Sequence, residues 1–411
     1  MIDEIVKWVS NEVHSDIPMV AMQALTILGH RLNIRISYGE GNVKPNLFTF
    51  ICGASTLSRK STSYKLLSHI YTVSDMEIGS RQALTAELRR EVNVLVFHDE
   101  ASDILKKMAN DTRGDIRLAG FLNKLSVVTD NSVTDETTLA ARQREGPDSN
   151  IIKSPKLSMI LLTTPKSLRD VTSEELVNGG FFFRCLVRIP TASRLTLSDK
   201  RAWSSESVRR TIDINAFRAR VGDASEDEWF VQESSEAISA RLHVTDTNER
   251  VSDELEAYIS RLSDSMVKCA AIKCVDRLID AGVPPSSRVH DITRDDMEWV
   301  IRYVASPSLK SFSMLFGCVC QSKELTRINQ LITDRVGIVN TPVRTTILKQ
   351  SLRMDVTMFD KLLPSIVLFQ GDMSVVMIEM NGHRIEHVCR SDDCEGCQYG
   401  ESCVKVLTND E

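Results

Sequence analysis

A lysine and a serine follow a short apolar stretch in the segment ICGASTLSRKST, residues 51–62. A phosphate-binding loop has the pattern G-x-x-x-x-G-K-[ST], in which glycines bring backbone N–H groups close to phosphate oxygens and the lysine reaches the terminal phosphates. Lys60 and Ser61 fit the end of this pattern, whereas Ala54 and Arg59 replace its two glycines. The segment predicts a nucleotide site that other parts of the chain must support. The residues expected to bind the nucleotide are Gly53, Ser55, Arg59, Lys60, Ser61, Thr62 and Asp99.

A pair of carboxylates ends the next apolar strand, VNVLVFHDE, residues 92–100. In P-loop ATPases such a pair holds Mg²⁺ and polarises the attacking water. We expect Asp99 to act on the metal and Glu100 to act on the water. A second interpretation is structural, because aspartate favours the N-cap of a helix and a helical pattern follows.

Two later segments carry further candidates. KLSMILLTTP, residues 156–165, is a strand that ends in Thr163 and Thr164, where an AAA+-type ATPase has a polar sensor between its two Walker strands. We predict Thr164 as the residue that senses the γ-phosphate. GGFFFRCLVRIP, residues 179–190, places Arg184 before another strand, where it would reach a nucleotide on a neighbouring subunit. A threonine at a strand end and a surface arginine are each common, and Arg188 is an alternative to Arg184.

The four segments in this order resemble the P-loop helicase domain of phages and plasmids, which is often fused to a primase. They are also similar, more distantly, to the minichromosome maintenance helicases. The resemblance covers roughly residues 18–305 and implies an ATP- and Mg²⁺-dependent DNA helicase or translocase, acting as a hexameric ring in the replication of a mobile element or virus. The chain lacks the primase module of that family, so a separate primase is an expected partner. Arg59 either adds a charged donor to phosphate or blocks the loop.

Alternating strands and helices predict an α/β fold with a P-loop AAA+-type parallel sheet. Long helical patterns follow, and the C-terminal part has the order of three helices and a hairpin. The predicted domains are a helical N-terminal region (1–45), the ATPase core (46–200), a helical lid (201–310), a winged-helix domain (311–388) and a Cys-rich metal-binding tail (389–411).

Two regions are candidates for DNA contact. The winged-helix domain carries Arg344, Lys349 and Arg353, which predict binding to DNA, although winged helices also dock onto proteins or cover an ATPase. The polar segment 133–155 contains Arg142, Arg144 and Lys153 around the turn GPDSN, where related helicases extend a hairpin into the ring channel. Neighbouring acidic residues dilute the charge of this segment, so a solvated loop is the alternative.

Four cysteines near the C-terminus follow the spacing C-x4-C-x2-C-x5-C and are predicted to bind one metal ion: Cys389, Cys394, Cys397 and Cys403. Tetrahedral zinc is favoured over an iron–sulfur cluster, whose last cysteine usually comes from farther away. Free thiols are the third interpretation, and His387 is a substitute ligand if Cys403 lies out of reach.

Composition limits the class of protein. The chain has 411 residues, is 42% hydrophobic and carries a formal net charge of -6, which excludes a uniformly basic DNA-coating protein. An apolar run of about 18 residues, as needed to span a membrane, is missing, so we expect a cytoplasmic protein without membrane contact. The expected partners are single-stranded or forked DNA, further copies of the chain and a primase. Two alternatives stay open: a non-translocating AAA+ ATPase that loads or remodels a replication partner, and a catalytically silent DNA-binding initiator.

Overall fold

The chain divides into two compact units in a computed structural model. The first comprises Met1–Thr164 and Val171–Ser311, and the second comprises Pro165–Asp170 and Phe312–Glu411. The structure describes residues 1–38, 41–53, 58–77, 80–91, 93–110, 138–140, 151–153, 155–171, 180–190, 219–222, 228–247, 253–285, 288–320, 343–344, 373–380, 383–390 and 403–405.

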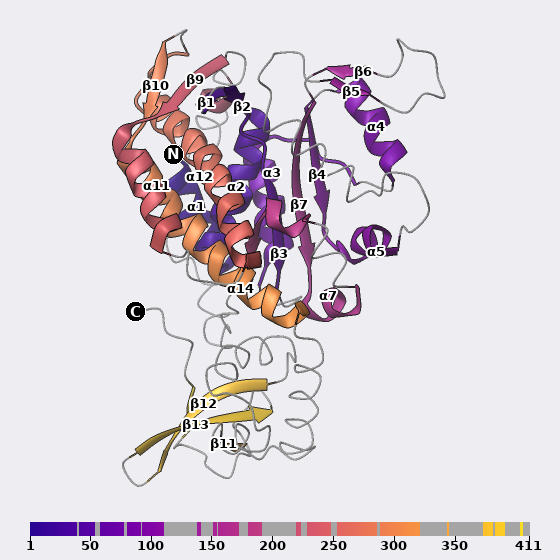
Figure 1. The fold of residues 1–411 in the computed structure, drawn as a ribbon, viewed down its shortest axis with the longest axis vertical. Coiled ribbons are helices and arrows are strands. Elements are labelled where there is room, and N and C mark those ends of the chain that lie inside the picture. The colour runs from indigo at the N-terminus through magenta and orange to yellow at the C-terminus, as the bar shows by residue number, and fades with distance from the viewer. Residues whose placement is uncertain are drawn as a thin grey trace. The chain divides into compact units, whose positions relative to one another are not determined.

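A four-stranded parallel sheet forms the core of the first unit (Figure 1). Its strands, in spatial order, are β4 (Asn93–His98), β7 (Lys156–Thr163), β3 (Phe48–Cys52) and β8 (Cys185–Arg188). β7 therefore lies between the strand before the phosphate loop and the strand before the acidic pair, as predicted. Every residue of β3 and β7 is buried, which is typical of a parallel sheet with both faces covered.

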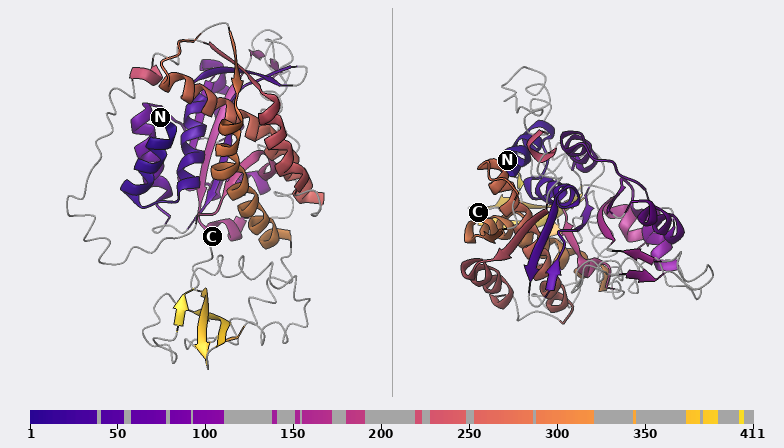
Figure 2. Two further views of the ribbon diagram at one scale, coloured as in Figure 1. Left: turned by 90° about the vertical axis from the view of Figure 1, so that its left-hand side faces the viewer. Right: turned by 90° about the horizontal axis from the view of Figure 1, so that it is seen from above.

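Helices surround this sheet (Figure 2). α2 (Ile17–Arg31) packs against β3, β4 and β7, and its almost continuous apolar sequence suits a helix that is buried on most sides. The other described helices in the first half of the chain are α1 (Ile2–Val13), α3 (Lys60–Tyr71), α4 (Arg81–Arg90) and α5 (Ser102–Asn110). Later in the first unit come α11 (Ser235–Thr247), α12 (Asp253–Asp280), α13 (Arg294–Val300), the π-helical turn Ile301–Ala305 and the start of α14 (Ser306–Cys320). The helix α7 (Pro165–Val171) belongs, except for its last residue, to the second unit.

A second sheet corrects two of the predicted domains. It has the order β10-β9-β1-β2 and joins β1 (Asn33–Tyr38) and β2 (Gly41–Val43) to β9 (Glu228–Glu233) and β10 (Val289–Ile292). The region 1–45 and the lid 201–310 were expected to be wholly helical, but each supplies two strands. In β1 and β9 buried residues alternate with more exposed ones, so the period of two was present in both short segments.

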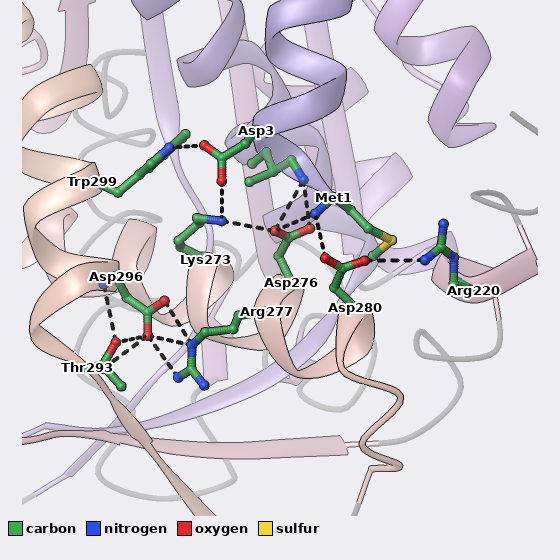
Figure 3. Close-up of polar contacts among 11 residues, drawn as sticks. Met1, Asp3, Arg220, Lys273, Asp276, Arg277, Asp280, Thr293, Asp296 and Trp299 are labelled. Atoms are coloured by element: carbon green, nitrogen blue, oxygen red, sulfur yellow. Dashed lines mark hydrogen bonds and ion pairs between the residues drawn. The ribbon is translucent and has the colours of Figure 1, made fainter. Parts of the chain in front are cut away.

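Polar contacts also tie the N-terminal region to the lid (Figure 3). The Lys273 ammonium on α12 lies 2.8 Å from the Asp3 carboxylate on α1 and 3.2 Å from Asp276. Asp276, which is 2% exposed, also accepts a hydrogen bond from the main-chain N–H of Ile2 at 3.0 Å. Trp299 on α13 donates its indole N–H to Asp3. Buried charges are stable only when they are paired in this way, so the two regions form one substructure.

The strands of the second unit form an antiparallel sheet with the order β11-β13-β12-β14. The predicted hairpin is confirmed by β12 (Met373–Met380) and β13 (His383–Arg390), which pair from Met380 with His383 to Met373 with Arg390. The other strands are β11 (Val343–Arg344) and β14 (Cys403–Lys405). Of the three helices predicted for the winged-helix domain, the second (342–352) contains the strand β11 instead, and the other two lie outside the described residues. The winged-helix domain therefore stays a prediction.

A short antiparallel pair occupies the segment in which a channel hairpin was predicted. β5 (Thr138–Ala140) pairs with β6 (Ile151–Lys153), and Thr138 lies opposite Lys153. Within the part of the chain that the structure describes, none of the helices combines the length and the apolar composition needed to cross a bilayer.

Lys156 begins β7 as a buried cation. Its ammonium donates to the carbonyls of Leu32 at 2.9 Å and His30 at 3.3 Å, where α2 ends. Burial lowers the pKa of Lys156 to about 7, and the nearby charge of Lys44 lowers it as well. An unfolded lysine keeps its proton up to about pH 10. Between about pH 7 and 10 the unfolded chain therefore binds more protons than the folded chain, and stability should rise with pH.

We expect Lys156→Met to raise the free energy of unfolding at pH 7 by about 2 kcal/mol, because it removes the cost of burying an ammonium. It should also flatten the rise in stability between about pH 7 and 9.5. Urea denaturation at several pH values measures both effects. Lys65→Met, at an exposed lysine on α3, is the matched control and should change stability by less than about 0.5 kcal/mol. A pH dependence in Lys156→Met as steep as in the wild type would contradict the assignment.

Candidate nucleotide-binding site

The residues predicted to bind a nucleotide come together at one edge of the parallel sheet. α3 begins at Lys60, shortly after β3 ends at Cys52. Asp99 and Glu100 directly follow β4, which ends at His98. Because the strands are parallel, their carboxyl ends meet at the same edge, where side chains from several strands can surround one ligand.

Ser61 and Asp99 are in direct contact. The Ser61 hydroxyl donates a short hydrogen bond to the Asp99 Oδ1 atom, and both side chains are half-buried. A hydroxyl and a carboxylate are the hard oxygen ligands that Mg²⁺ takes beside phosphate. α5 begins at Ser102, so the N-cap position is residue 101 and Asp99 is not the N-cap of this helix. The contact thus favours the metal-site interpretation of Asp99.

Lys60 lies within electrostatic reach of the acidic pair. It is 4% exposed, and burial lowers its pKa below the ordinary value. The charges of Asp99 and Glu100 act in the opposite direction and favour the protonated form. An ammonium beside two carboxylates at a helix N-terminus can bind a Mg²⁺-bound triphosphate, because the ligand brings both charge signs.

Glu100 contacts a hydroxyl from the central strand. Thr163, the wholly buried last residue of β7, donates its hydroxyl to Glu100 Oε1 at 3.3 Å. Glu100 itself is exposed, as a residue that acts on a water molecule must be. The sequence predicts Thr164 as the sensor, and that residue is the half-buried neighbour of Thr163. Thr163 is therefore a site residue that the sequence prediction passed over, although it is the last position of the same apolar run.

Two described positions at the ends of the phosphate loop favour glycine, although only the second is a glycine position of the pattern. At Gly53 a Cβ atom would lie 2.7 Å from both Pro190 Cγ and Ser58 Oγ, so a side chain does not fit. Arg59 has φ 52° and ψ 23°, the left-handed conformation that favours glycine, at the position where the pattern has its second glycine. Ser55 lies outside the described residues, and Thr62 is exposed on the first turn of α3.

A pair of stacked rings holds α3 against β4. The rings of Tyr64 and Phe97 lie 3.7 Å apart at an interplanar angle of 5°. The Tyr64 hydroxyl also donates to Asp75. Since Tyr64 follows Lys60 by one helical turn and Phe97 precedes Asp99 by two residues, this stack fixes the helix and the strand that carry the two halves of the site.

Arg184 lies at the opposite edge of the sheet. It precedes β8, whose first residue Cys185 pairs with Phe48 at the start of β3. The five residues of β3 span about 16 Å, so the Arg184 region is well separated from Lys60 in the same chain. Arg184 donates to the carbonyl of Gly180 at 2.8 Å. It also lines a small cavity, together with Asn46, Leu47, Phe48, Arg261, Asp264, Ser265 and Lys268.

Arg188, the alternative to Arg184, has a structural partner. Its guanidinium binds the Asp16 carboxylate with two hydrogen bonds, one of them 2.8 Å long from Nε. Asp16 also caps α2 by accepting from the Met19 N–H at 2.9 Å. Both side chains of this ion pair are largely buried. Arg184 is therefore the better candidate for a residue that acts on another subunit.

The predicted DNA-binding residues are only partly described. Lys153 lies in β6, and Arg344 lies in β11, where it pairs with His387 of β13. The placement of Arg344 in a strand corrects its expected position in the helix 342–352. Arg142, Arg144, Lys349 and Arg353 lie outside the described residues, so their roles stay predictions.

The strand register does not bring the described tail cysteines together. Cys389 pairs with Ser374 on one side of β12, and Cys403 pairs with Ile378 on the other side. Two strand spacings and four residues along β12 separate them by about 16 Å, which is too far for one zinc ion with Zn–S bonds of about 2.3 Å. Cys394 and Cys397 lie outside the described residues. Among the residues that are described, no cluster of three or more potential ligands forms a metal site, so zinc stays a prediction.

Comparisons with known proteins do not assign the chain to a family. Neither a protein-family model nor a curated protein matches it. Among solved structures, it is similar to SCCmec type IV Cch, an active helicase, with 11% sequence identity and a TM-score of 0.34 over 95% of this chain and 70% of the other. A similarity this low does not establish a shared activity. The functional conclusion therefore rests on the residues of this chain.

We expect Arg59→Gly to stabilise the protein by about 0.5 to 1 kcal/mol, because glycine adopts the left-handed conformation without a Cβ clash. Arg59→Ala is the control, since alanine keeps the Cβ and should give no such gain. Denaturant unfolding without nucleotide measures the difference between the two variants. Equal stability of the two variants would show that the observed backbone conformation carries no strain.

Proposed function

We propose that this chain is an ATPase that drives movement on DNA, a helicase or translocase in the replication of a mobile element or virus. The observation that carries the ATPase activity is the contact between Ser61 and Asp99, beside the buried Lys60. This contact joins the phosphate loop to the acidic pair. A purely structural role of either segment would not require such a contact. The motor on DNA is supported by the sequence resemblance and by the antiparallel strands β5 and β6.

Each residue has a part in the proposed reaction. Lys60 and the main chain at the start of α3 bind the phosphates, while Ser61 and Asp99 hold Mg²⁺. The metal supplies charge neutralisation on the phosphate oxygens. Glu100 accepts a proton from the attacking water, and Thr163 holds one of its carboxylate oxygens. Thr164 is the proposed sensor of the γ-phosphate.

Arg184 completes the site from a neighbouring subunit. Its place at the far edge of the sheet suits a residue that acts across an interface rather than within its own chain. The positive charges of Arg261 and Lys268 line the same cavity and would add to the attraction for a phosphate. A ring, proposed as a hexamer, repeats this interface without open ends.

We expect the wild type to hydrolyse ATP and to respond to single-stranded or forked DNA. Lys60→Ala should weaken ATP binding, and Glu100→Gln should lower kcat by at least about 100-fold while ATP still binds. Arg294→Ala, at an exposed arginine on α13, is the control and should hydrolyse ATP at the wild-type rate. Phosphate release with and without DNA measures these outcomes. Stimulation by a replication protein instead of DNA would favour a loader, and complete inactivity would favour a silent initiator.

We expect Lys60→Ala and Arg184→Ala to be inactive alone and to restore activity when mixed. In a ring assembled at random from equal amounts, about a quarter of the interfaces pair an intact Lys60 with an intact Arg184. Activity near that fraction of the wild-type rate is therefore expected. Light scattering coupled to gel filtration determines the size of the assembly. A mixture as inactive as its components, or a fully active monomer of Arg184→Ala, would contradict action across an interface.

A further inference from the structure

Gln23 is a buried amide inside α2, an apolar helix of the first unit. It lies on α2 and is wholly buried. Its side chain makes two hydrogen bonds, both with the first turn of α3. The Nε2 atom donates to the main-chain carbonyl of Lys60 at 2.9 Å, and the Oε1 atom accepts from the Ser63 hydroxyl at 2.8 Å. Burial of an amide is costly without such partners, so α2 has a specific contact with the helix that carries Lys60.

Chemistry fixes the orientation of this amide. The carbonyl of Lys60 can only accept a hydrogen bond, so the NH₂ group of Gln23 must face it. The amide oxygen then faces Ser63, whose hydroxyl can donate. Arg59, which occupies the N-cap position of α3, makes no side-chain capping bond. Gln23 therefore holds the first turn of α3 from another helix, through a main-chain carbonyl and not through the N–H groups that an N-cap side chain would bind.

We propose that Gln23 is a positioning residue for the nucleotide. It fixes the first turn of α3, so that the Lys60 ammonium and the Ser61 hydroxyl stay directed toward Asp99 and Glu100. This inference rests on the proposed ATP-binding function of the same site. A small displacement of a phosphate-binding turn weakens every contact that the turn makes, because the N–H groups and the side chains move together.

The same helix offers a matched control. Thr26 lies one turn after Gln23, is also wholly buried, and makes a hydrogen bond of 2.7 Å with the Thr49 hydroxyl. Thr49 lies within β3, not on α3. After Gln23→Met the Ser63 hydroxyl keeps only the Lys60 carbonyl as an acceptor, at 2.9 Å, and after Thr26→Val the Thr49 hydroxyl loses Thr26. Each change removes buried hydrogen bonding by one side chain, so both should destabilise the fold by about 1 kcal/mol. Only the change at Gln23 should affect the position of Lys60.

The test compares Gln23→Met with Thr26→Val in the full-length chain. A fluorescent ATP analogue with Mg²⁺ measures affinity, and thermal unfolding without nucleotide measures stability. We expect Gln23→Met to weaken binding about 10-fold and to raise KM for ATP by a similar factor, with kcat within about two-fold of the wild type. Thr26→Val should bind within about two-fold of the wild type despite a similar loss in melting temperature. Equal affinities of the two variants would overturn the proposal.

Three more variants separate the donor from the acceptor. Gln23→Glu keeps the shape, but burial favours its neutral acid, which can still donate to Lys60, whereas Gln23→Leu has neither donor nor acceptor. We expect Gln23→Leu to lose as much affinity as Gln23→Met and Gln23→Glu to keep more of it at pH 6 than at pH 9. Ser63→Ala leaves the bond from Gln23 to the Lys60 carbonyl intact and should weaken binding less than about three-fold. Wild-type affinity in Gln23→Leu would overturn the proposal even if Gln23→Met does not fold. A wild type that does not bind the analogue would instead reject the proposed function itself.

Discussion

The hydrogen bond between Ser61 and Asp99 is the contact on which the site depends. It requires α3 to begin where it does, with Arg59 in a left-handed conformation that turns the chain into the helix. It also requires the end of β4 to lie close to the first turn of α3, although β7 separates β4 from β3 in the sheet. The stacked rings of Tyr64 and Phe97 meet this second requirement, because they connect the helix and the strand directly.

The two edges of the parallel sheet carry different halves of the proposed chemistry. The carboxyl edge has the ammonium, the hydroxyls and the carboxylates, whereas the opposite edge has Arg184 and its cavity. Mixed charges at the first edge suit a metal–phosphate complex, and excess positive charge at the second suits phosphate alone. The geometry of a single chain keeps these halves apart. A reaction that uses both therefore depends on assembly.

The sequence predicts the parallel sheet well because its strands are continuous apolar runs that end in polar residues. In VLVFHDE and KLSMILLTT the apolar run predicts the strand, and the polar residues after it predict where the strand ends. Both strands lie where they were expected. The role of Thr164 as a sensor stays a prediction, and the contact of the neighbouring Thr163 with Glu100 was not predicted. Neighbouring residues of a strand face opposite ways, so one residue decides which hydroxyl reaches Glu100.

The strands β1, β9 and β10 were missed because each is short and the pairings of β9 with β1 and β10 join residues far apart in the chain. The alternation in a run as short as Glu228–Glu233 is a weak signal, and long helical patterns surround it. The contact between Gln23 and Lys60 was missed for a similar reason. The sequence shows a polar residue within an apolar helix, but only the packing of α2 beside α3 reveals its partners.

The pairing of β1 with β9 affects how the polypeptide reaches its native state. Ile34 lies opposite Trp229, and β10 joins the other side of β9. Such nonlocal pairing is slow, because a long loop must close before any contact forms. During synthesis on the ribosome, the edge of β1 that pairs with β9 stays unpaired until β9 has emerged. Nascent chains are therefore open to aggregation through that edge over this interval, and chaperones that shield exposed strands would protect them.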